Sequence, residues 1–448
     1  MIGVDIGSAF IKAIDVVKEK GHLAISAVGL VETPADTVAN GVVVDPVAVG
    51  SALRSLLTSN NFKGKRVVIS VGGQSSLAVR VVDLPKMSDS ELRRSMRLDL
   101  ERHLPFPVEG TVHDFAKISP RDAGPDDQGI EVLLAAAQQA LIEGHVKVLD
   151  EARIYPIAID IEPLALCRSL VSARANGGPR TVAIVNMGAQ LTEICVVRDG
   201  LLRFVRSAPL AGDAFTNAVG QNLVIDSKQA ESIKRQYATI LLEERLEGAA
   251  PEQPPAAATG FHTPLDIVPE PEEKEEEEKE ELEFGAPPPL PEVDELTMPA
   301  DESSSPGAAG RTGAGAPSAE GAASPRVPQQ ASAPQAGSGG QSDEEYTRHQ
   351  ISEALVGPLA DLAREVHATF DYFSTRKGLE VERVLLVGGS SQIRNLAEFM
   401  TRELGVETLL ATPFENLTLA APSVSPDFLS SIAPFMAVCT GLAMRDLL

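Results

Sequence analysis

Two distant stretches of the chain repeat one pattern of alternating apolar residues interrupted by glycine turns. Each predicts three successive strands, at 2–6, 10–17 and 22–31 in the first stretch and at 182–185, 194–197 and 201–205 in the second. A tight hairpin is predicted at Asp199-Gly200, because this dipeptide favours the turn that joins twisted antiparallel strands. The repeat indicates a duplicated β-meander. It disfavours a Rossmann fold, in which a helix directly follows the glycine turn.

Between the two stretches, the spacing of apolar residues predicts a helix over Ser88–His103. Ser88 and Glu91 fit a capping box at its start, and Pro105-Phe106-Pro107 ends it because proline cannot continue a helix. Leu92, Met96 and Leu100 fall on one face, and the arginines Arg93, Arg94, Arg97 and Arg102 fall outside it. With strands predicted at 77–82, 111–118 and 130–137, this helix makes a small α+β subdomain.

A long segment at 248–343 has a different composition from the rest of the chain. It is rich in Pro, Ala, Gly, Ser and Glu and carries an acidic run at 270–283. Because such a sequence cannot bury enough apolar area to offset its ordering entropy, we expect it to be disordered. It can serve as a solvated spacer or as an arm that contacts a basic partner. Helices predicted at 227–247 and 344–377 flank it, so it interrupts one domain between two helices.

The net charge of −24 comes mainly from this segment. Residues 248–345 contain 21 Asp or Glu against 4 Lys or Arg, which leaves about −7 for the remainder, an ordinary value for a cytoplasmic protein. Nucleic-acid binding is therefore disfavoured, since it needs a basic face.

The cysteines and the apolar runs set further limits. Cys167, Cys195 and Cys439 each lie in an apolar run, which predicts buried thiols in a reducing compartment and no disulfide or zinc site. No window approaches 18 consecutive apolar residues and no signal sequence is recognisable, so we expect neither secretion nor membrane insertion.

The first glycine turn carries residues suited to a phosphate. Gly7 and Ser8 would let a phosphate approach the backbone amides of the turn. Asp5 can hold a hydrated Mg²⁺, and Lys12 adds a cation. An isolated turn of this kind is more often structural. The second turn, Asn186-Met187-Gly188-Ala189-Gln190, strengthens the phosphate interpretation, because two facing hairpins can clamp a polyphosphate.

A third turn, Gly388-Gly389-Ser390-Ser391, follows a strand predicted at 384–387 and precedes a helix predicted at 393–402. This position would place backbone amides at the positive end of a helix, where they suit an adenosine phosphate or sugar. Further helices are predicted at 161–171 and 433–445.

Four runs carry a resemblance to a known family: GVDIGSAFIKAI at 3–14, LERHLPFPVEGTVHDF at 100–115, YPIAIDIEPLAL at 155–166 and VLLVGGSSQIRNL at 384–396. With the three turns, they make the chain resemble the actin, Hsp70 and sugar-kinase ATPase superfamily. Within it, the chain resembles the PilM family of type IV pilus assembly proteins, relatives of the cell-division protein FtsA. The resemblance covers essentially everything except the segment at 248–343.

This resemblance implies an α/β, actin-like (ribonuclease H-like) fold of two duplicated lobes, with a small inserted α+β subdomain and a long disordered insertion in the second lobe. The implied division is 1–82, completed by 150–178 and 430–448, for the first lobe, 83–149 for the small subdomain, 179–247 and 344–429 for the second lobe, and 248–343 for the insertion.

The resemblance also implies that ATP and Mg²⁺ bind. Asp5 would hold Mg²⁺ through water, and Ser8, Lys12 and the amides around Gly7 would contact the β and γ phosphates. Glu162 matches the carboxylate that orients the attacking water in Hsp70-like proteins, although an acid that starts a helix before proline looks the same. Glu231 and Lys234 match side chains that reach the ribose and adenine, or they are solvated helix charges. The implied nucleotide site is completed by Asn186, Gly188, Gly388, Gly389, Ser390 and Ser391.

One residue departs from the superfamily pattern. Asn186 stands where most members have an acid, and an amide brings no charge to Mg²⁺ or to a nucleophile. We therefore expect ATP binding with weak or no hydrolysis.

By this resemblance, the chain would be a cytoplasmic scaffold of the type IV pilus assembly complex at the inner-membrane face. Its partner would be the cytoplasmic amino-terminal peptide of a PilN-like membrane protein, docked in a groove between the first lobe and the small subdomain near 83–150. PilO, PilP and the motor ATPases would connect to it indirectly, and the chain would form a homo-oligomer or ring.

Three alternatives stay open. An FtsA-like filament-forming membrane tether would end in a basic amphipathic helix, whereas the last residues here are Met444-Arg445-Asp446-Leu447-Leu448. A small-molecule kinase would need a catalytic Asp in the cleft, and no candidate for that base stands out. The third is a homologous type II secretion component.

Overall fold

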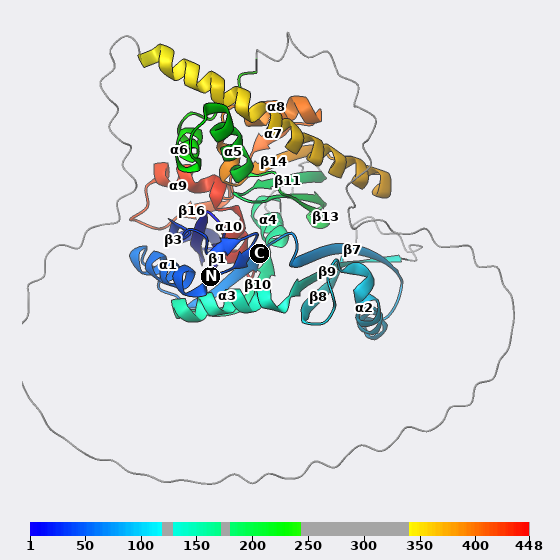
Figure 1. Cartoon of the computed structure of the whole chain (residues 1–448). Coiled ribbons are helices and arrows are strands. Elements are labelled where there is room, and N and C mark those ends of the chain that lie inside the picture. Colours follow the sequence, from blue (N-terminus) through cyan, green and yellow to red (C-terminus); the bar gives the residue numbers. More distant parts are fainter. Residues whose placement is uncertain (119–128, 172–179, 243–339, 448) are drawn as a thin grey trace, which may run out of the picture. The chain divides into compact units, whose positions relative to one another are not determined.

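The computed structural model describes residues 1–118, 129–171, 180–242 and 340–447. Two large β-sheets organise them (Figure 1). The first has the strand order β10-β6-β1-β2-β3-β16 and the second the order β13-β12-β11-β14-β15. In each, a three-stranded antiparallel meander is continued by two parallel strands beside its first strand. The duplicated meander that the sequence predicts is therefore confirmed.

The strands of the first sheet are β1 (Ile2–Ile6), β2 (Phe10–Glu19), β3 (His22–Glu32), β6 (Arg66–Val71), β10 (Tyr155–Ile161) and β16 (Leu417–Leu419). Those of the second sheet are β11 (Thr181–Met187), β12 (Thr192–Arg198), β13 (Leu201–Ala208), β14 (Arg383–Val387) and β15 (Thr408–Leu410). A separate short pair is formed by β4 (Val38–Ala39) and β5 (Val42–Val43).

Each large sheet and its helices form what we call a lobe. The helices of the first lobe are α1 (Pro46–Ser59), α3 (Gln139–Ala152), α4 (Glu162–Leu170), α9 (Pro426–Ile432) and α10 (Ala437–Ala443). Those of the second lobe are α5 (Gly212–Leu223), α6 (Ser227–Tyr237), α7 (Gly340–Lys377) and α8 (Leu396–Leu404). The predicted disordered insertion lies outside the described residues, except that α7 begins at Gly340, four residues before the predicted start.

Two-residue turns fix the register of both meanders. Lys20-Gly21 joins β2 to β3, and Asp199-Gly200 joins β12 to β13, with positive φ at all four residues. Such turns match the right-handed twist of the strands that they connect, so the side chains that alternate along each strand keep their assigned faces.

The contact of α10 with β1 and α4 is so close that only glycine fits at two positions. A Cβ atom at Gly3 would lie 2.0 Å from the carbonyl oxygen of Cys439, and one at Gly441 would lie 1.8 Å from that of Ala165. Helix α4 lies between the two sheets (Figure 1). It shares with α10 an apolar cluster that we call the apolar junction, because both sheets contribute to it. Its members include Val68, Leu166, Ile184, Leu385 and Leu442.

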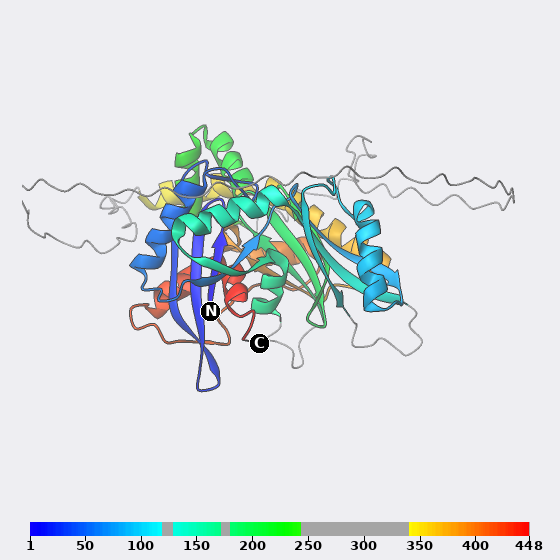
Figure 2. The same ribbon diagram turned by 90° about the horizontal axis from the view of Figure 1, so that it is seen from below.

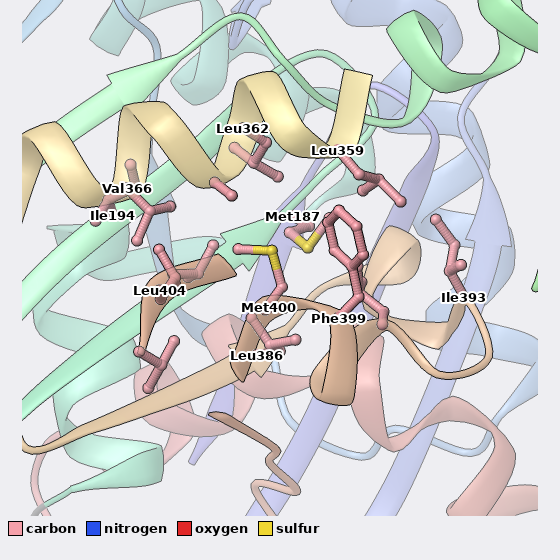
Figure 3. Packing of buried hydrophobic residues seen from close by; sticks show 14 of the residues in the cluster. Met187, Ile194, Leu359, Leu362, Val366, Leu386, Ile393, Phe399, Met400 and Leu404 are labelled. Atoms are coloured by element: carbon pink, nitrogen blue, oxygen red, sulfur yellow. The ribbon is translucent and has the colours of Figure 1, made fainter. Parts of the chain in front are cut away.

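The core of the second lobe lies between its sheet and the long helix α7 (Figure 3). Leu359, Leu362 and Val366 have the spacing of one helix face and are fully buried. They face Met187 and Leu386 of the sheet and Met400 of α8 (Figure 3). This packing holds β11 and β14, and therefore the turns that follow them, in fixed positions.

A three-stranded sheet of order β7-β9-β8, covered by α2, makes the small subdomain (Figure 2). Its elements are β7 (Leu77–Pro85), α2 (Asp89–His103), β8 (Thr111–Ile118) and β9 (Gly129–Gln138). The capping box at Ser88 and Glu91 is present, and Leu92, Met96 and Leu100 are buried, as predicted. Lys377 of α7 contacts the carboxylates of Asp83 and Glu131 at 2.9 and 2.8 Å, which ties this sheet to the second lobe.

The predicted domain boundaries stay a proposal. The boundary expected between residues 82 and 83 falls inside strand β7. Helix α3, which spans the boundary expected between residues 149 and 150, packs against α1 in the core of the first lobe through Val148 and Leu149.

Three predicted helices have different bounds, because tertiary contacts overrule their local pattern. The one predicted at 227–247 ends at Tyr237, where the chain turns to pair with the loop before α8: the N–H of Ile240 donates to the carbonyl of Arg394 at 3.0 Å. The one predicted at 393–402 begins only at Leu396, since Asn395 is left-handed with φ of 62°.

The helix predicted at 433–445 is broken into a 3₁₀ turn, Ala433–Phe435, and α10. The carbonyl of Pro434 accepts a hydrogen bond from the N–H of Gly388 in the second lobe at 2.8 Å, so this carbonyl bonds across to the other lobe and not within a continuous helix. Within the described residues, no single helix is long and apolar enough to cross a bilayer. Pro426–Phe435 and Ala437–Ala443 reach that length only together, across a 98° bend. All three cysteines are buried and form no disulfide, as predicted.

Candidate functional site

A cavity of about 780 Å³ lies between the lobes and is bounded by all three glycine turns. Its volume is typical of small-molecule sites. Every site residue predicted from the sequence lines it except Ser391: Asp5, Gly7, Ser8, Lys12, Glu162, Asn186, Gly188, Glu231, Lys234, Gly388, Gly389 and Ser390. We call this cavity the cleft.

The first turn contributes a buried ion pair to the cleft. Lys12 lies directly opposite Asp5 in the β1–β2 register, and its Nζ donates to Asp5 Oδ2 at 2.5 Å. Burial alone would lower the pKa of Lys12, but the attraction of Asp5 outweighs it and the pKa is raised. The N–H of Gly7 donates to the carbonyl of Phe10 at 3.1 Å and closes the turn. The pair therefore places a charged lysine at the base of the cleft.

The second turn has the same backbone but different chemistry. The N–H of Gly188 donates to the carbonyl of Leu191 at 3.0 Å, and Asn186 lies opposite Glu193 in the β11–β12 register. Glu193 is 9% exposed, and its Oε2 has no hydrogen-bond partner within the described residues. Burial, followed by repulsion from Glu162 and Asp5, raises the pKa of Glu193 well above its usual value. This turn therefore brings a carboxyl group that sequence reasoning missed.

Glu162 begins α4 directly after β10 and also faces the cleft. Burial raises its pKa to about 7, with a further contribution from Asp5, while Lys12 opposes the shift. The position of Glu162 is compatible with a role in orienting water and with a purely structural role at the start of a helix. It is the first residue of α4 and is followed by Pro163, and its carboxyl group also lines the cleft.

The residues of α6 form one wall of the cleft. The ammonium of Lys234 is buried and has three acceptors: the carbonyl of Gly212 at 2.8 Å, the hydroxyl of Thr216 at 2.6 Å and the carboxylate of Glu231 at 2.7 Å. Burial would raise the pKa of Glu231, but hydrogen bonds from Lys234 and Thr216 lower it to about 2. These two side chains are thus not solvated helix charges, and Lys234 must exchange one of its acceptors to touch a ligand.

The third turn differs from its prediction. Gly388, with φ of 90°, is followed by a 3₁₀ turn over Gly389–Gln392, so its amides do not begin an α-helix. Ser390 lines the cleft and donates to the carbonyl of Gly188 at 3.2 Å, which joins the third turn to the second. Ser391 is buried outside the lining, and its hydroxyl donates to the carbonyl of Gly388 at 2.7 Å. Its short side chain therefore closes the turn, and its predicted contact with a nucleotide stays a prediction.

The residues present fit a nucleotide that carries hydrated Mg²⁺. Asp5, Glu162 and Glu193 are near enough that Asp5 raises the pKa of both glutamates. The unpartnered Oε2 of Glu193 is a buried acceptor that a cation or its water can satisfy. Within the described ranges, no three acidic, histidine or cysteine side chains are placed to hold a bare metal ion.

Sequence reasoning also passed over Phe10, Thr216 and Arg235 in the lining. Of the missed residues, only Glu193 had a signal in the sequence. The tight second turn pairs Asn186 with the seventh residue after it, just as the first turn pairs Asp5 with Lys12.

The class of protein follows from fold and cleft together. The structure aligns over 99% of its length with 97% of a chain of a solved "PilM-PilN type IV pilus biogenesis complex", with a TM-score of 0.68 and 22% identity. The ethanolamine utilization protein EutJ from Carboxydothermus hydrogenoformans aligns with a TM-score of 0.45 and 13% identity, over 99% of this chain and 88% of that one. The chain has the actin-like ATPase fold, as predicted.

The family is shown by sequence. A family model described as "Type IV pilus assembly protein PilM" matches residues 3–239 and 335–447, and the chain belongs to this family. A stretch of 257 residues is 24% identical to the cell division protein FtsA of Streptococcus pneumoniae serotype 2 (strain D39 / NCTC 7466), covering 52% of this chain and 55% of that protein. The match thus spans about half the length of this curated relative.

Proposed function

We propose that the cleft binds ATP with hydrated Mg²⁺ and that the bound nucleotide holds the two lobes in the arrangement that a partner recognises. One observation carries the proposal: two hairpins of the same register, one from each lobe, face a single cavity lined with buried carboxyl groups. A ligand that touches both hairpins favours one arrangement of the lobes, to the extent that it binds that arrangement more tightly.

In this proposal, Asp5 acts on Mg²⁺ through water, and Ser8, Lys12 and the turn amides act on the phosphates. Glu231 and Lys234 form the wall toward the ribose and adenine. The bound cation supplies charge neutralisation of the phosphates. Glu162 orients water, and hydrolysis is slow or absent, since Asn186 brings no charge to the second turn.

The partner is the cytoplasmic amino-terminal peptide of a PilN-like inner-membrane protein, docked between the first lobe and the small subdomain. The support is family membership, together with the likeness to a chain solved in a PilM–PilN complex. The chain then works in the cytoplasm at the inner-membrane face without inserting into the bilayer. It forms a homo-oligomer or ring that PilO, PilP and the motor ATPases contact indirectly.

Calorimetric titration with ATP and Mg²⁺, followed by binding of a labelled peptide with the partner's amino-terminal sequence, tests both parts. We expect saturable ATP binding and tighter peptide binding when ATP is present. Ser8→Leu, which fills the first turn, should weaken ATP binding at least about tenfold. Ser51→Leu, exposed on α1 and outside the cleft, is the matched control and should leave it unchanged.

The two parts can fail separately. A cleft that takes up no ATP at millimolar concentration contradicts the nucleotide proposal. ATP binding combined with peptide affinity that is the same with and without ATP contradicts the scaffold proposal and leaves the nucleotide site standing.

A further inference from the structure

The small subdomain is attached to the first lobe by the chain and to the second lobe by side chains. Strand β6 of the first lobe leads into β7, and β9 leads directly into α3. On its other side, β7 lies beside β13, and both are edge strands of separate sheets (Figure 1). We call the contact of β7 and β9 with β13 and the end of α7 the seam.

Opposite charges hold the seam together. Asp83 of β7 lies directly opposite Glu131 of β9 in the strand register. Two acids in such positions repel each other, so both need a cation. Lys377 serves both, with its Nζ 2.9 Å from Asp83 Oδ1 and 2.8 Å from Glu131 Oε1. Burial would lower the pKa of Lys377, but its hydrogen bonds to Glu131 and Asp83 outweigh this effect and raise the pKa.

A second cation reaches Glu131 from the edge of the second sheet. The guanidinium of Arg203 on β13 pairs with Glu131 Oε2, and the two side chains are only 5% and 17% exposed. Separating a buried pair leaves a charge without compensation, which is strongly unfavourable, whereas an exposed pair contributes little. The seam therefore resists separation more than an exposed salt bridge would.

The cations of the seam stand on one packed unit. Phe204, the neighbour of Arg203, packs against Tyr372 of α7, with 5.1 Å between the ring centres. Arg206 of the same strand pairs with Glu365 of α7. Strand β13 and the end of α7 are thus fixed to each other, and they present Arg203 and Lys377 together to the small subdomain.

We propose that the small subdomain moves with the second lobe, and that a nucleotide in the cleft thereby changes the width of the groove between the first lobe and the small subdomain. This inference rests on the proposed function, because it assigns the route by which ATP acts on the peptide site. No described residue of the small subdomain lines the cleft, so the route is indirect. When the lobes change their arrangement, either the seam breaks or the two chain connections to the first lobe bend. The buried pair at the seam favours bending.

The test measures two distances by pulsed electron paramagnetic resonance, with and without ATP and Mg²⁺. Spin labels are attached to introduced cysteines, since the three native ones are buried. Ser51→Cys on α1 combined with Leu98→Cys on α2 reports the position of the small subdomain relative to the first lobe. Ser51→Cys combined with Glu398→Cys on α8 reports the arrangement of the lobes. All three positions are exposed, and ATP should shift both distances by more than about 2 Å.

Two variants weaken the seam from opposite sides. Glu131→Gln keeps the shape of the side chain and removes its charge, so ATP should still shift the α1–α8 distance while the shift of the α1–α2 distance is lost. Lys377→Met should have the same effect, and it keeps the test valid if Glu131→Gln does not fold, because Lys377 is more exposed, at 26%. Glu365→Gln is the matched control. It removes a pair between the same strand and helix but inside the second lobe, and should keep both shifts.

The outcomes separate the inference from the function on which it rests. If both distances respond in the parent and only the α1–α8 distance responds in the two seam variants, the inference is supported. If only the α1–α8 distance responds in the parent, or if the α1–α2 shift persists in both seam variants, the inference is overturned and the proposed function stands. If calorimetry shows no bound ATP, or if ATP binds and neither distance responds, the proposed function fails and the inference fails with it.

Discussion

The lobes meet on two sides of the cleft, and the two contacts differ in kind. On the inner side, α4 and α10 of the first lobe fill the apolar junction, which they share with Ile184 and Leu385 of the second sheet. These two helices approach each other so closely that Gly441 has no space for a methyl group. At the mouth the contacts are polar. The N–H of Asn40 donates to the side chain of Gln190 at 2.7 Å, and Arg235 lies 5.4 Å from the ring centre of Phe10.

This difference assigns different roles to the two sides. Close-packed apolar contacts tolerate little change in volume, whereas exposed ion pairs contribute about 0–1 kcal/mol. Arg235 also pairs with Glu32 at 3.5 Å, with the two side chains 50% and 71% exposed. We infer that the inner side acts as a fixed pivot and that the mouth opens by breaking contacts worth little, as an exchanging ligand requires.

The largest effect is expected at the pivot. Gly441→Ala would put a Cβ atom 1.8 Å from the carbonyl oxygen of Ala165, which is backbone and cannot rotate away. We expect a loss of roughly 3 kcal/mol in the free energy of unfolding, measured by urea denaturation. Gly144→Ala in α3 is the control: its Cβ meets Val43 at an ordinary 3.6 Å, so it should stabilise the protein by about 0.5–1 kcal/mol. Equal midpoints for the two variants would contradict the close packing of α10 on α4 that underlies the pivot.

A smaller effect is expected where the pivot meets the cleft, at Glu162. Its pKa is raised to about 7 from a usual 4.5, so the folded state holds the proton more tightly than the unfolded chain. The stabilising contribution is complete below about pH 4.5 and is lost as the pH rises through 7. The free energy of unfolding of Glu162→Gln should therefore exceed that of the parent by about 2 kcal/mol at pH 8, and the two values should be equal near pH 4.5.

The measurement is the urea midpoint across that pH range. Glu398→Gln, exposed on α8, is the control and should follow the parent curve. Curves for parent and Glu162→Gln that run parallel from pH 4.5 to 8 would show that Glu162 does not titrate in this window.

The sequence predicted features that depend on residues close together in the chain, and it missed features that depend on contacts with distant residues. Elements with local signals were predicted: the Asp199-Gly200 turn, the capping box at Ser88 and the alternating strands all depend on residues close in sequence. The glycine turns were also found, since glycine at a tight turn needs no partner elsewhere. Their assembly into one cleft came from the family resemblance, because no local pattern states which turns face each other.

The missed features depend on distant backbone groups. The break before α10 arises where Pro434 bonds to Gly388, and α6 ends where Ile240 meets Arg394. The register of the second turn signals that Glu193 lies opposite Asn186, but its burial depends on the other elements that line the cleft. The position of Ser391 outside the cleft lining has a local cause, since a serine in a turn can bond within the turn as readily as to a ligand.

The smallest effect on stability is expected at the mouth, yet it tests the comparison most directly. Arg235→Gln removes the exposed pair with Glu32, the contact with Phe10 and, within α6, a pair with Glu231, so the free energy of unfolding should change by only about 1 kcal/mol. Arg364→Gln is the matched control, because its pair with Asp361 is also exposed but lies within α7 alone. The two variants should therefore have similar midpoints.

Only Arg235→Gln should speed amide hydrogen exchange around Asn40 and Gln190, by up to about fivefold, because opening of the mouth becomes easier by up to about 1 kcal/mol. Exchange that is equally unchanged in both variants would mean that the mouth is held by something other than these contacts, and the division into a fixed pivot and an opening mouth would have to be abandoned.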